Sequence, residues 1–184
     1  MDKRITKTKT AIYNGLALCL AHQDYGSLSI GDVLSASGVS RSTFYAHFKS
    51  LDDVLDSVGK DIFNHVFSHT LEEEGTHDFS KTSLLDYGHF ITHILYHLHD
   101  EKDLISVILQ SSGRDIFLRD LRSKLRPLSV KAVETGLLPR KDLPKELQIE
   151  QAIESFVVLI VYWFGNGCVE TPEVMTKYFS VINS

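Results

Sequence analysis

Residues 29–49 read SIGDVLSASGVSRSTFYAHFK, and the fold is decided within this stretch. Ser29 is a good N-cap for a short helix, because its hydroxyl can accept a hydrogen bond from a free amide of the first turn. Gly38 can take a positive φ without a steric penalty and so allows a tight turn. Ser40 can cap a second helix that runs to about His47. Two short helices joined by a glycine turn are the pattern of a helix-turn-helix.

The two faces of the second helix differ in chemistry. Phe44 and Phe48 are placed to lock it onto the preceding helices, while its other face carries small or polar side chains. Arginine can read guanine with two hydrogen bonds, serine or threonine can bond a base or a phosphate, and a helix N-terminus offers amide donors to phosphate oxygens. The candidate DNA contacts on this face are Arg41, Ser42, Thr43, Tyr45 and His47. Helical hairpins that bind no DNA are also common in all-α proteins, so this alternative stays open at this point.

The charge is divided unequally along the chain. The 184 residues carry a net charge of −5, which by itself argues against nucleic acid as a partner. Residues 1–50 hold six basic side chains and three acidic ones, a net of +3, so the remainder carries −8. Because DNA repels an acidic body, the basic segment would have to be the part that docks.

Helical spacing dominates the whole chain, and no period-2 run is long enough for a sheet. The sequence therefore predicts an all-α fold of about nine helices. Their expected ranges are 4–22, 30–36, 41–47, 51–74, 80–99, 102–110, 114–135, 146–164 and a last helix from 172.

Residues 4–58 resemble the N-terminal region of the TetR (tetracycline-repressor) family of bacterial regulators. The order of the parts carries the resemblance: a helix with alanines and leucines, a Tyr-Gly break, then S-I-x-D-V-x-x-x-S-G-V-S-R-S-T-F-Y-x-H-F-K-S and an acidic start to the fourth helix. The resemblance implies a three-helix DNA-binding head over residues 1–50 and a helical ligand-binding and dimerisation body over residues 51–184. It also implies that Arg4, Lys7 and Lys9 could follow a neighbouring groove. The DNA-contacting set that it implies is Ser29, Ser40, Arg41, Ser42, Thr43, Tyr45, His47 and Lys49.

Two positions depart from the family pattern. The family usually has a phosphate-contacting lysine where this chain has Leu51, and it often has a large polar residue where this chain has Ala46. Both changes remove possible contacts to the DNA backbone, so the affinity of the head alone is expected to be modest. Strong dimerisation or a protein partner could compensate, and a co-regulator working through a protein partner is the alternative function.

The resemblance implies a homodimer on a near-palindromic double-stranded DNA operator, with a repressor as the expected role. Residues 157–164 are apolar almost all round, and such a helix must be buried on every face. A partner subunit could cover one of those faces, although a central core helix in a monomer would satisfy the same pattern. The candidate dimer residues are Ile153, Phe156, Val157, Ile160, Val161, Phe164, Met175 and Phe179.

The middle helices of the family usually enclose a small-molecule pocket whose occupancy alters the spacing of the heads. The resemblance therefore implies an unknown small-molecule effector for this chain. The candidate lining residues are Phe63, Phe67, Phe90, Ile94, Tyr96, Leu109, Phe117 and Tyr162.

Seven of the nine histidines lie between His65 and His99. His89, His93 and His97 are four residues apart, which places them on one helix face, as metal ligation requires. They are weak candidates for a metal or pH sensor. A helical wheel puts them opposite the apolar stripe of their helix, so a solvated polar face is the favoured interpretation.

Several function classes lack support. The sequence contains no GxSxG, HExxH, P-loop or GxGxxG context, so neither an enzyme nor a cofactor is predicted. Cys19 and Cys168 are far apart, which suggests neither a disulfide framework nor a zinc site. The N-terminus lacks the apolar core of a signal peptide, and the longest apolar run, residues 156–164, is short of the roughly 20 residues of a membrane span. A cytoplasmic protein without membrane association is expected.

Overall fold

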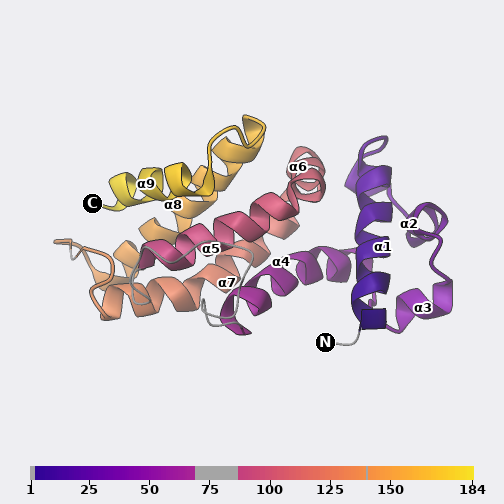
Figure 1. Cartoon of the computed structure of the whole chain (residues 1–184), viewed down its shortest axis with the longest axis horizontal. Coiled ribbons are helices and arrows are strands. Elements are labelled where there is room, and N and C mark those ends of the chain that lie inside the picture. Colours follow the sequence, from indigo (N-terminus) through magenta and orange to yellow (C-terminus); the bar gives the residue numbers. More distant parts are fainter. Residues whose placement is uncertain (1–2, 69–86, 140) are drawn as a thin grey trace. The chain divides into compact units, whose positions relative to one another are not determined.

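The computed structural model describes the backbone of residues 3–68, 87–139 and 141–184, and the side chains of residues 5–61, 90–139 and 141–184. Within these ranges the chain forms nine α-helices and one short 3-10 turn, η1, with no strand (Figure 1). The all-α prediction is therefore confirmed. The elements are α1 (Lys3–Leu20), η1 (Tyr25–Ser27), α2 (Ile30–Ser37), α3 (Arg41–Tyr45), α4 (Leu51–Ser68), α5 (Tyr87–Asp100), α6 (Lys102–Gln110), α7 (Arg114–Glu134), α8 (Lys145–Gly165) and α9 (Pro172–Asn183).

The chain divides into two compact units. Unit 1 comprises residues 1–59 and 101–118, and unit 2 comprises residues 60–100 and 119–184. Unit 1 thus adds α6 and the first turn of α7 to the segment in which the sequence places the head. The functional division at residue 50 stays a prediction.

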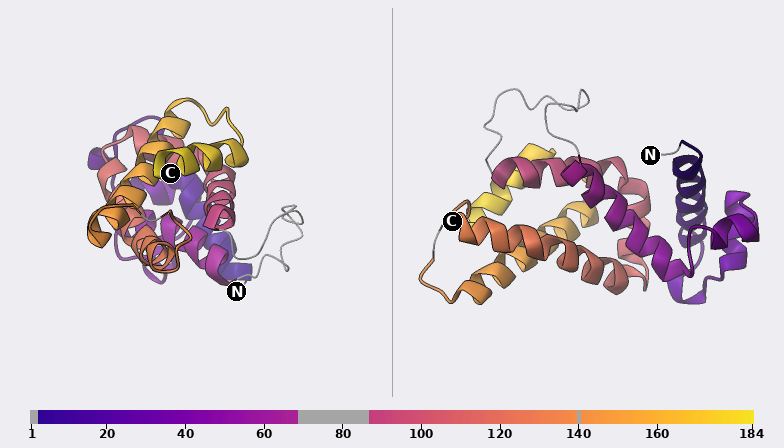
Figure 2. Two further views of the ribbon diagram at one scale, coloured as in Figure 1. Left: turned by 90° about the vertical axis from the view of Figure 1, so that its left-hand side faces the viewer. Right: turned by 90° about the horizontal axis from the view of Figure 1, so that it is seen from below.

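The core of unit 1 joins α1 to the helix-turn-helix and to the start of α4. Ile12 and Leu16 of α1 are fully buried, as are Val33 of α2 and Val54 and Leu55 of α4. α1 also packs against α2 (Figure 2) and α6.

The approach of α1 to α2 is close at Gly15. A Cβ atom on Gly15 would lie 2.7 Å from the Cβ atom of Ser37, so only glycine fits there without a shift of the backbone. Burial of these apolar side chains is what holds the short α2 and α3 in place, since helices of eight and five residues are not stable alone.

The local signals of the helix-turn-helix are confirmed. Ser29 and Asp32 form a reciprocal capping box at the start of α2, and Gly38 ends that helix with φ +68°. Ser40 caps α3 by accepting a hydrogen bond from the amide of Thr43. α3 ends at Tyr45, two residues earlier than expected, and a tight turn follows in which the amides of residues 47 and 48 both bond to the carbonyl of Phe44.

Unit 2 is built around α8. α9 packs against both α5 and α8 (Figures 1 and 2). Asn183 of α9 donates a buried hydrogen bond to Ser155 of α8, and the hydroxyls of Thr92 and Thr176 join α5 to α9. Pro172 occupies the first position of α9, as predicted, where a missing amide hydrogen costs nothing.

α8 is long and apolar enough to cross a membrane by length and composition alone, with 21 residues and a mean hydropathy of 1.3. However, 61% of the 18-residue window of α8 that has this hydropathy is buried inside the protein. Glu150 and Glu154 on its polar side pair with Arg126 and Arg122 of α7. Burial and ion pairs of this kind are typical of a core helix rather than of a membrane span.

Candidate nucleic-acid interface

The exposed side of α3 carries the chemistry that DNA recognition needs. Arg41 and Ser42 are exposed, and Tyr45 keeps 50% of its surface accessible. Phe44 and Phe48, on the opposite side, are buried and pack against each other with ring centroids 5.7 Å apart. The prediction that the two phenylalanines lock the helix in place is confirmed, and it leaves the polar face free to approach a ligand.

Three hydroxyls gather at the start of α3. The Ser40 Oγ atom lies 3.0 Å from Ser42 Oγ and 2.7 Å from Thr43 Oγ1, and it accepts the amide hydrogen of Thr43 at 3.1 Å. Each hydroxyl can donate one hydrogen bond and accept two, so the cluster retains capacity for a base edge or a phosphate. Their mutual bonds reduce the rotational freedom that binding would otherwise remove.

Ser29 already has an anionic partner. Its hydroxyl and its amide both donate to Asp32 Oδ2, at 2.6 and 2.8 Å. These hydrogen bonds hold the pKa of the Asp32 carboxyl below its ordinary value, so the carboxylate stays charged at neutral pH. A phosphate contact at Ser29 would therefore bring a second negative charge close to Asp32, which weakens Ser29 as a candidate.

The start of α4 explains one departure from the family pattern. Leu51 is only 9% exposed and belongs to the core of unit 1. The first turn of α4 is capped by its own residues, since Asp53 accepts the amide of Lys49 at 2.9 Å and donates its amide to Ser50 at 3.1 Å. The Lys49 side chain is exposed. Position 51 thus contributes packing, and Lys49 is the basic side chain at this end of the head.

The basic side chains of α1 that the structure describes, those of Lys7 and Lys9, have different surroundings. The Lys9 ammonium donates to Ser57 Oγ at 3.0 Å, and the Tyr13 hydroxyl donates to the same oxygen at 2.9 Å. Lys9 is therefore turned toward α4 rather than toward solvent, whereas Lys7 is exposed. The side chain of Arg4 lies outside the described residues.

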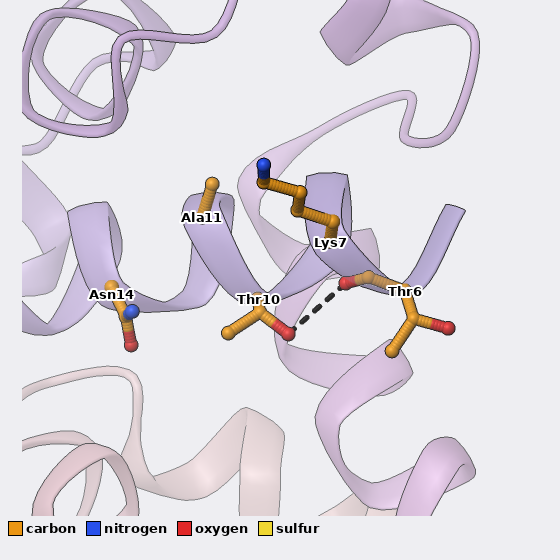
Figure 3. Close-up of a pocket in the computed structure, with 5 residues that line it drawn as sticks. All are labelled: Thr6, Lys7, Thr10, Ala11 and Asn14. Atoms are coloured by element: carbon orange, nitrogen blue, oxygen red, sulfur yellow. Dashed lines mark hydrogen bonds between the residues drawn. The ribbon is translucent and has the colours of Figure 1, made fainter. Parts of the chain in front are cut away.

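Figure 3 shows the surroundings of Lys7, an open hollow of about 540 Å³. All five of its lining residues belong to one helix, α1, so it is a depression in the surface rather than an enclosed site. They are Thr6, Lys7, Thr10, Ala11 and Asn14.

The candidate effector residues are divided between the two units of the chain. The side chains of Phe63 and Phe67 lie outside the described residues, and Leu109 and Phe117 belong to unit 1 while the other four belong to unit 2. Neither the hollow on α1 nor a second one of about 510 Å³, between the end of α7 and the start of α8, is lined by any of them. In unit 2, Ile94 is buried, Phe90 is half-buried, the Tyr96 hydroxyl bonds to Glu173, and Tyr162 is exposed.

Most of the candidate dimer residues lie within the core of unit 2. Val161 is half-buried, and the other seven are buried: Ile153, Phe156, Val157, Ile160, Phe164, Met175 and Phe179.

The exposed apolar side chains of α8 and α9 are different ones. Val158 and Tyr162 lie four residues apart on α8, and Tyr178 and Val181 lie three apart on α9. The negative charge of Glu170 raises the pKa of Tyr162, and Tyr178 adds a smaller contribution, which places the two phenols in one electrostatic neighbourhood. We call Val158, Tyr162, Tyr178 and Val181 the α8–α9 face. The sequence carries no signal for this face on α8, because residues 157–164 are apolar almost all round.

The solvated polar face that we expected on α5 is wrong for His93. This side chain is only 1% exposed, and its Nε2 atom lies 2.9 Å from Nε2 of His97. A hydrogen bond between the two rings needs one Nε2 atom to donate and the other to accept, so His93 bonds to His97 inside the protein and does not face water. The side chain of His89 lies outside the described residues. Among the residues that the structure describes, no group of three or more His, Cys, Asp or Glu side chains could hold a metal ion.

Two family models match this chain. The model for bacterial regulatory proteins of the tetR family matches residues 12–58, and a model for a transcriptional regulator C-terminal region matches residues 86–184. Among curated proteins, the uncharacterized HTH-type transcriptional regulator YxbF of Bacillus subtilis (strain 168) is 21% identical over 188 residues, which cover 97% of this chain and 45% of that protein. This chain therefore spans less than half the length of that relative.

Solved structures share the fold. A TetR transcriptional regulator from Streptococcus agalactiae 2603V is 26% identical with a TM-score of 0.66, and the match covers 100% of this chain and 97% of that one. A TetR family transcription regulator from Marinobacter aquaeolei VT8 is 18% identical with a TM-score of 0.55, over 99% of this chain and 96% of that one.

Proposed function

This chain belongs to the TetR family of bacterial regulatory proteins, and on that premise we propose that it is a DNA-binding transcription regulator that reads its operator with α3. The observation that carries the proposal is the two-sided character of α3, with Phe44 and Phe48 buried beneath it and Arg41 and Tyr45 exposed. In this proposal Arg41 and the hydroxyls of Ser42 and Thr43 contact base edges. Tyr45, His47 and Lys49 contact the phosphate backbone.

The proposal includes a homodimer on a near-palindromic site, because one short recognition helix covers few base pairs. The exposed α8–α9 face supports this part, since two tyrosines and two valines offer apolar area for a second subunit to cover. The buried candidates behind it, such as Phe156 and Phe179, would support the interface from within.

A repressor role and release by a small molecule complete the proposal, and both rest on the family. The low-molecular-weight fraction of a cell extract, added to the protein on its operator, tests the second point. Release of the DNA supports an effector. If the protein keeps its DNA in the presence of this fraction, an effector in the extract is contradicted.

The DNA contact is tested with duplexes that the wild-type protein selects from a random-sequence pool. An Arg41→Ala, Tyr45→Ala double variant should lose about 1–3 kcal/mol of binding to the selected duplex, roughly 5- to 150-fold in affinity. Arg119→Ala, which removes an exposed arginine in unit 2, is the matched control and should bind as the wild type does. Equal binding by the double variant and the wild type would show that α3 is not the reading helix. Failure of the wild type to select any sequence would favour the alternative of a co-regulator that works through a protein partner.

A further inference from the structure

A small cluster of hydrogen bonds joins the link between α1 and α2 to the turn between α6 and α7, 86 to 88 residues away in the sequence. Asp24 Oδ1 accepts the amide hydrogen of Ser112 at 2.8 Å, and Asp24 Oδ2 accepts the Ser112 hydroxyl at 2.5 Å. The amide of Gly26 donates to both Asp24 Oδ2, at 3.1 Å, and Ser112 Oγ, at 3.0 Å. All of these residues belong to unit 1.

Tyr25 strengthens the same junction from the other side. It is buried, and its hydroxyl donates to Asp52 Oδ1 on α4 at 2.5 Å. Burial and this hydrogen bond raise the pKa of Tyr25, so the phenol stays a donor at all ordinary pH values. A Cβ atom on Gly113 would lie 3.0 Å from the Tyr25 ring and 3.3 Å from Leu55, so glycine allows the α6–α7 turn to sit directly against the ring.

This junction lies between the entry to the helix-turn-helix and the start of α7. Asp24 lies five residues before Ser29, the N-cap of α2, and η1 fills most of the distance between them. On the other side, Ser112 lies two residues before α7, which begins in unit 1 and continues as one helix into unit 2. The first turn of α7 and the entry to the helix-turn-helix are thus tied through one carboxylate.

We propose that Asp24, Tyr25, Ser112 and Gly113 form a head clasp that positions the helix-turn-helix for DNA, so that displacement of the α6–α7 turn weakens operator binding. The four are positioning residues, and this proposal rests on the DNA-binding function proposed above. The hydrogen bonds from Ser112, followed by that from Gly26, lower the pKa of the Asp24 carboxyl. The carboxylate therefore remains ionised, and able to accept these bonds, well below neutral pH.

Hydrogen–deuterium exchange of the full-length protein tests the clasp without DNA. Ser112→Ala removes the hydroxyl and keeps the backbone amide, and Ser112→Thr keeps a hydroxyl. We expect amide exchange in α2 to be roughly 3- to 10-fold faster in Ser112→Ala than in the wild type, close to wild type in Ser112→Thr, and unchanged in α8 of unit 2. Ser123→Ala, at an exposed serine of α7, is the matched control. Gly113→Ala should reproduce the effect of Ser112→Ala by displacing the Tyr25 ring.

Binding to the selected duplex gives the second readout, through a double-mutant cycle. Asp24→Asn and Ser112→Ala should each weaken binding roughly 3- to 10-fold, and the double variant should weaken it no further than the stronger single variant. Effects that multiply in the double variant, or faster exchange in both units, would overturn the clasp and indicate a general loss of stability. Faster exchange in α2 alone, in a protein that selects no duplex, would support the clasp and contradict the proposed function. If Ser112→Ala behaves as Ser123→Ala does in both hydrogen–deuterium exchange and DNA binding, the clasp is overturned and the proposed DNA-binding function is unaffected.

Discussion

Position 51 shows how one residue can be read differently in the sequence and in the structure. In the sequence, Leu51 stands where the family usually has a phosphate-contacting lysine. In the structure, its side chain is part of the core of unit 1, beside the buried Val54 and Leu55. Ala46, the other departure, is exposed at the end of α3. The two departures therefore have different structural consequences.

This difference predicts that lysine substitutions at the two positions affect protein stability differently. Leu51→Lys should lower the free energy of unfolding by about 1–3 kcal/mol, because a buried apolar side chain is replaced by one whose charge must reach water. Ala46→Lys should change stability by less than about 0.5 kcal/mol and should bind the selected duplex more tightly, since it adds a charge on the exposed side. Urea unfolding followed by circular dichroism, together with a DNA titration, measures both. Equal stability of the two variants would contradict the core role of Leu51.

At the scale of helices, the sequence predicted where the helices lie and how they are capped better than it predicted which side of each helix is buried. The capped α2 and α3 follow from Ser29, Gly38 and Ser40, because these signals are local and act through the backbone. His93 was misplaced because a helical wheel ranks faces by polarity, whereas burial of a polar face depends on neighbouring helices. For α8, a run that is apolar on every face carries no information about which side meets its own core. The exposed α8–α9 face could be identified only from the packed structure.

The assignment of that face leads to a prediction about assembly. Val158→Asp combined with Val181→Asp should shift the protein from dimer to monomer, because two carboxylates per subunit would have to be buried without partners in the interface. Leu18→Asp, at an exposed leucine of α1 in unit 1, should leave the oligomeric state unchanged. Sedimentation velocity measures the mass of each variant. A wild-type protein that is monomeric at all concentrations tested, or a double variant that remains dimeric, would contradict this interface.

At the scale of the whole molecule, the division of charge agrees with the family assignment but limits the expected strength of DNA binding. A net charge of −5 means that attraction to DNA depends on a few basic side chains in residues 1–50. Of these, Lys9 is bonded to Ser57, while Lys7, Arg41 and Lys49 are exposed. Residue types alone indicated the basic segment, and the structure shows which of its described charges, those of Lys7, Lys9, Arg41 and Lys49, face solvent.

Two lysines that are exposed among the described side chains, Lys7 and Lys49, predict the salt dependence of operator binding. A dimer that neutralises about four phosphates with them should show a slope of about −4 in a plot of log affinity against log salt concentration, since each contact releases roughly 0.9 of a counterion. Fluorescence anisotropy of a labelled selected duplex over a range of salt concentrations measures this slope. Lys49→Gln should make the slope shallower by about 2 in the dimer, whereas Lys9→Gln should leave it unchanged because that ammonium is directed toward α4. A slope that responds equally to both substitutions would show that Lys9 leaves Ser57 to contact DNA in the complex.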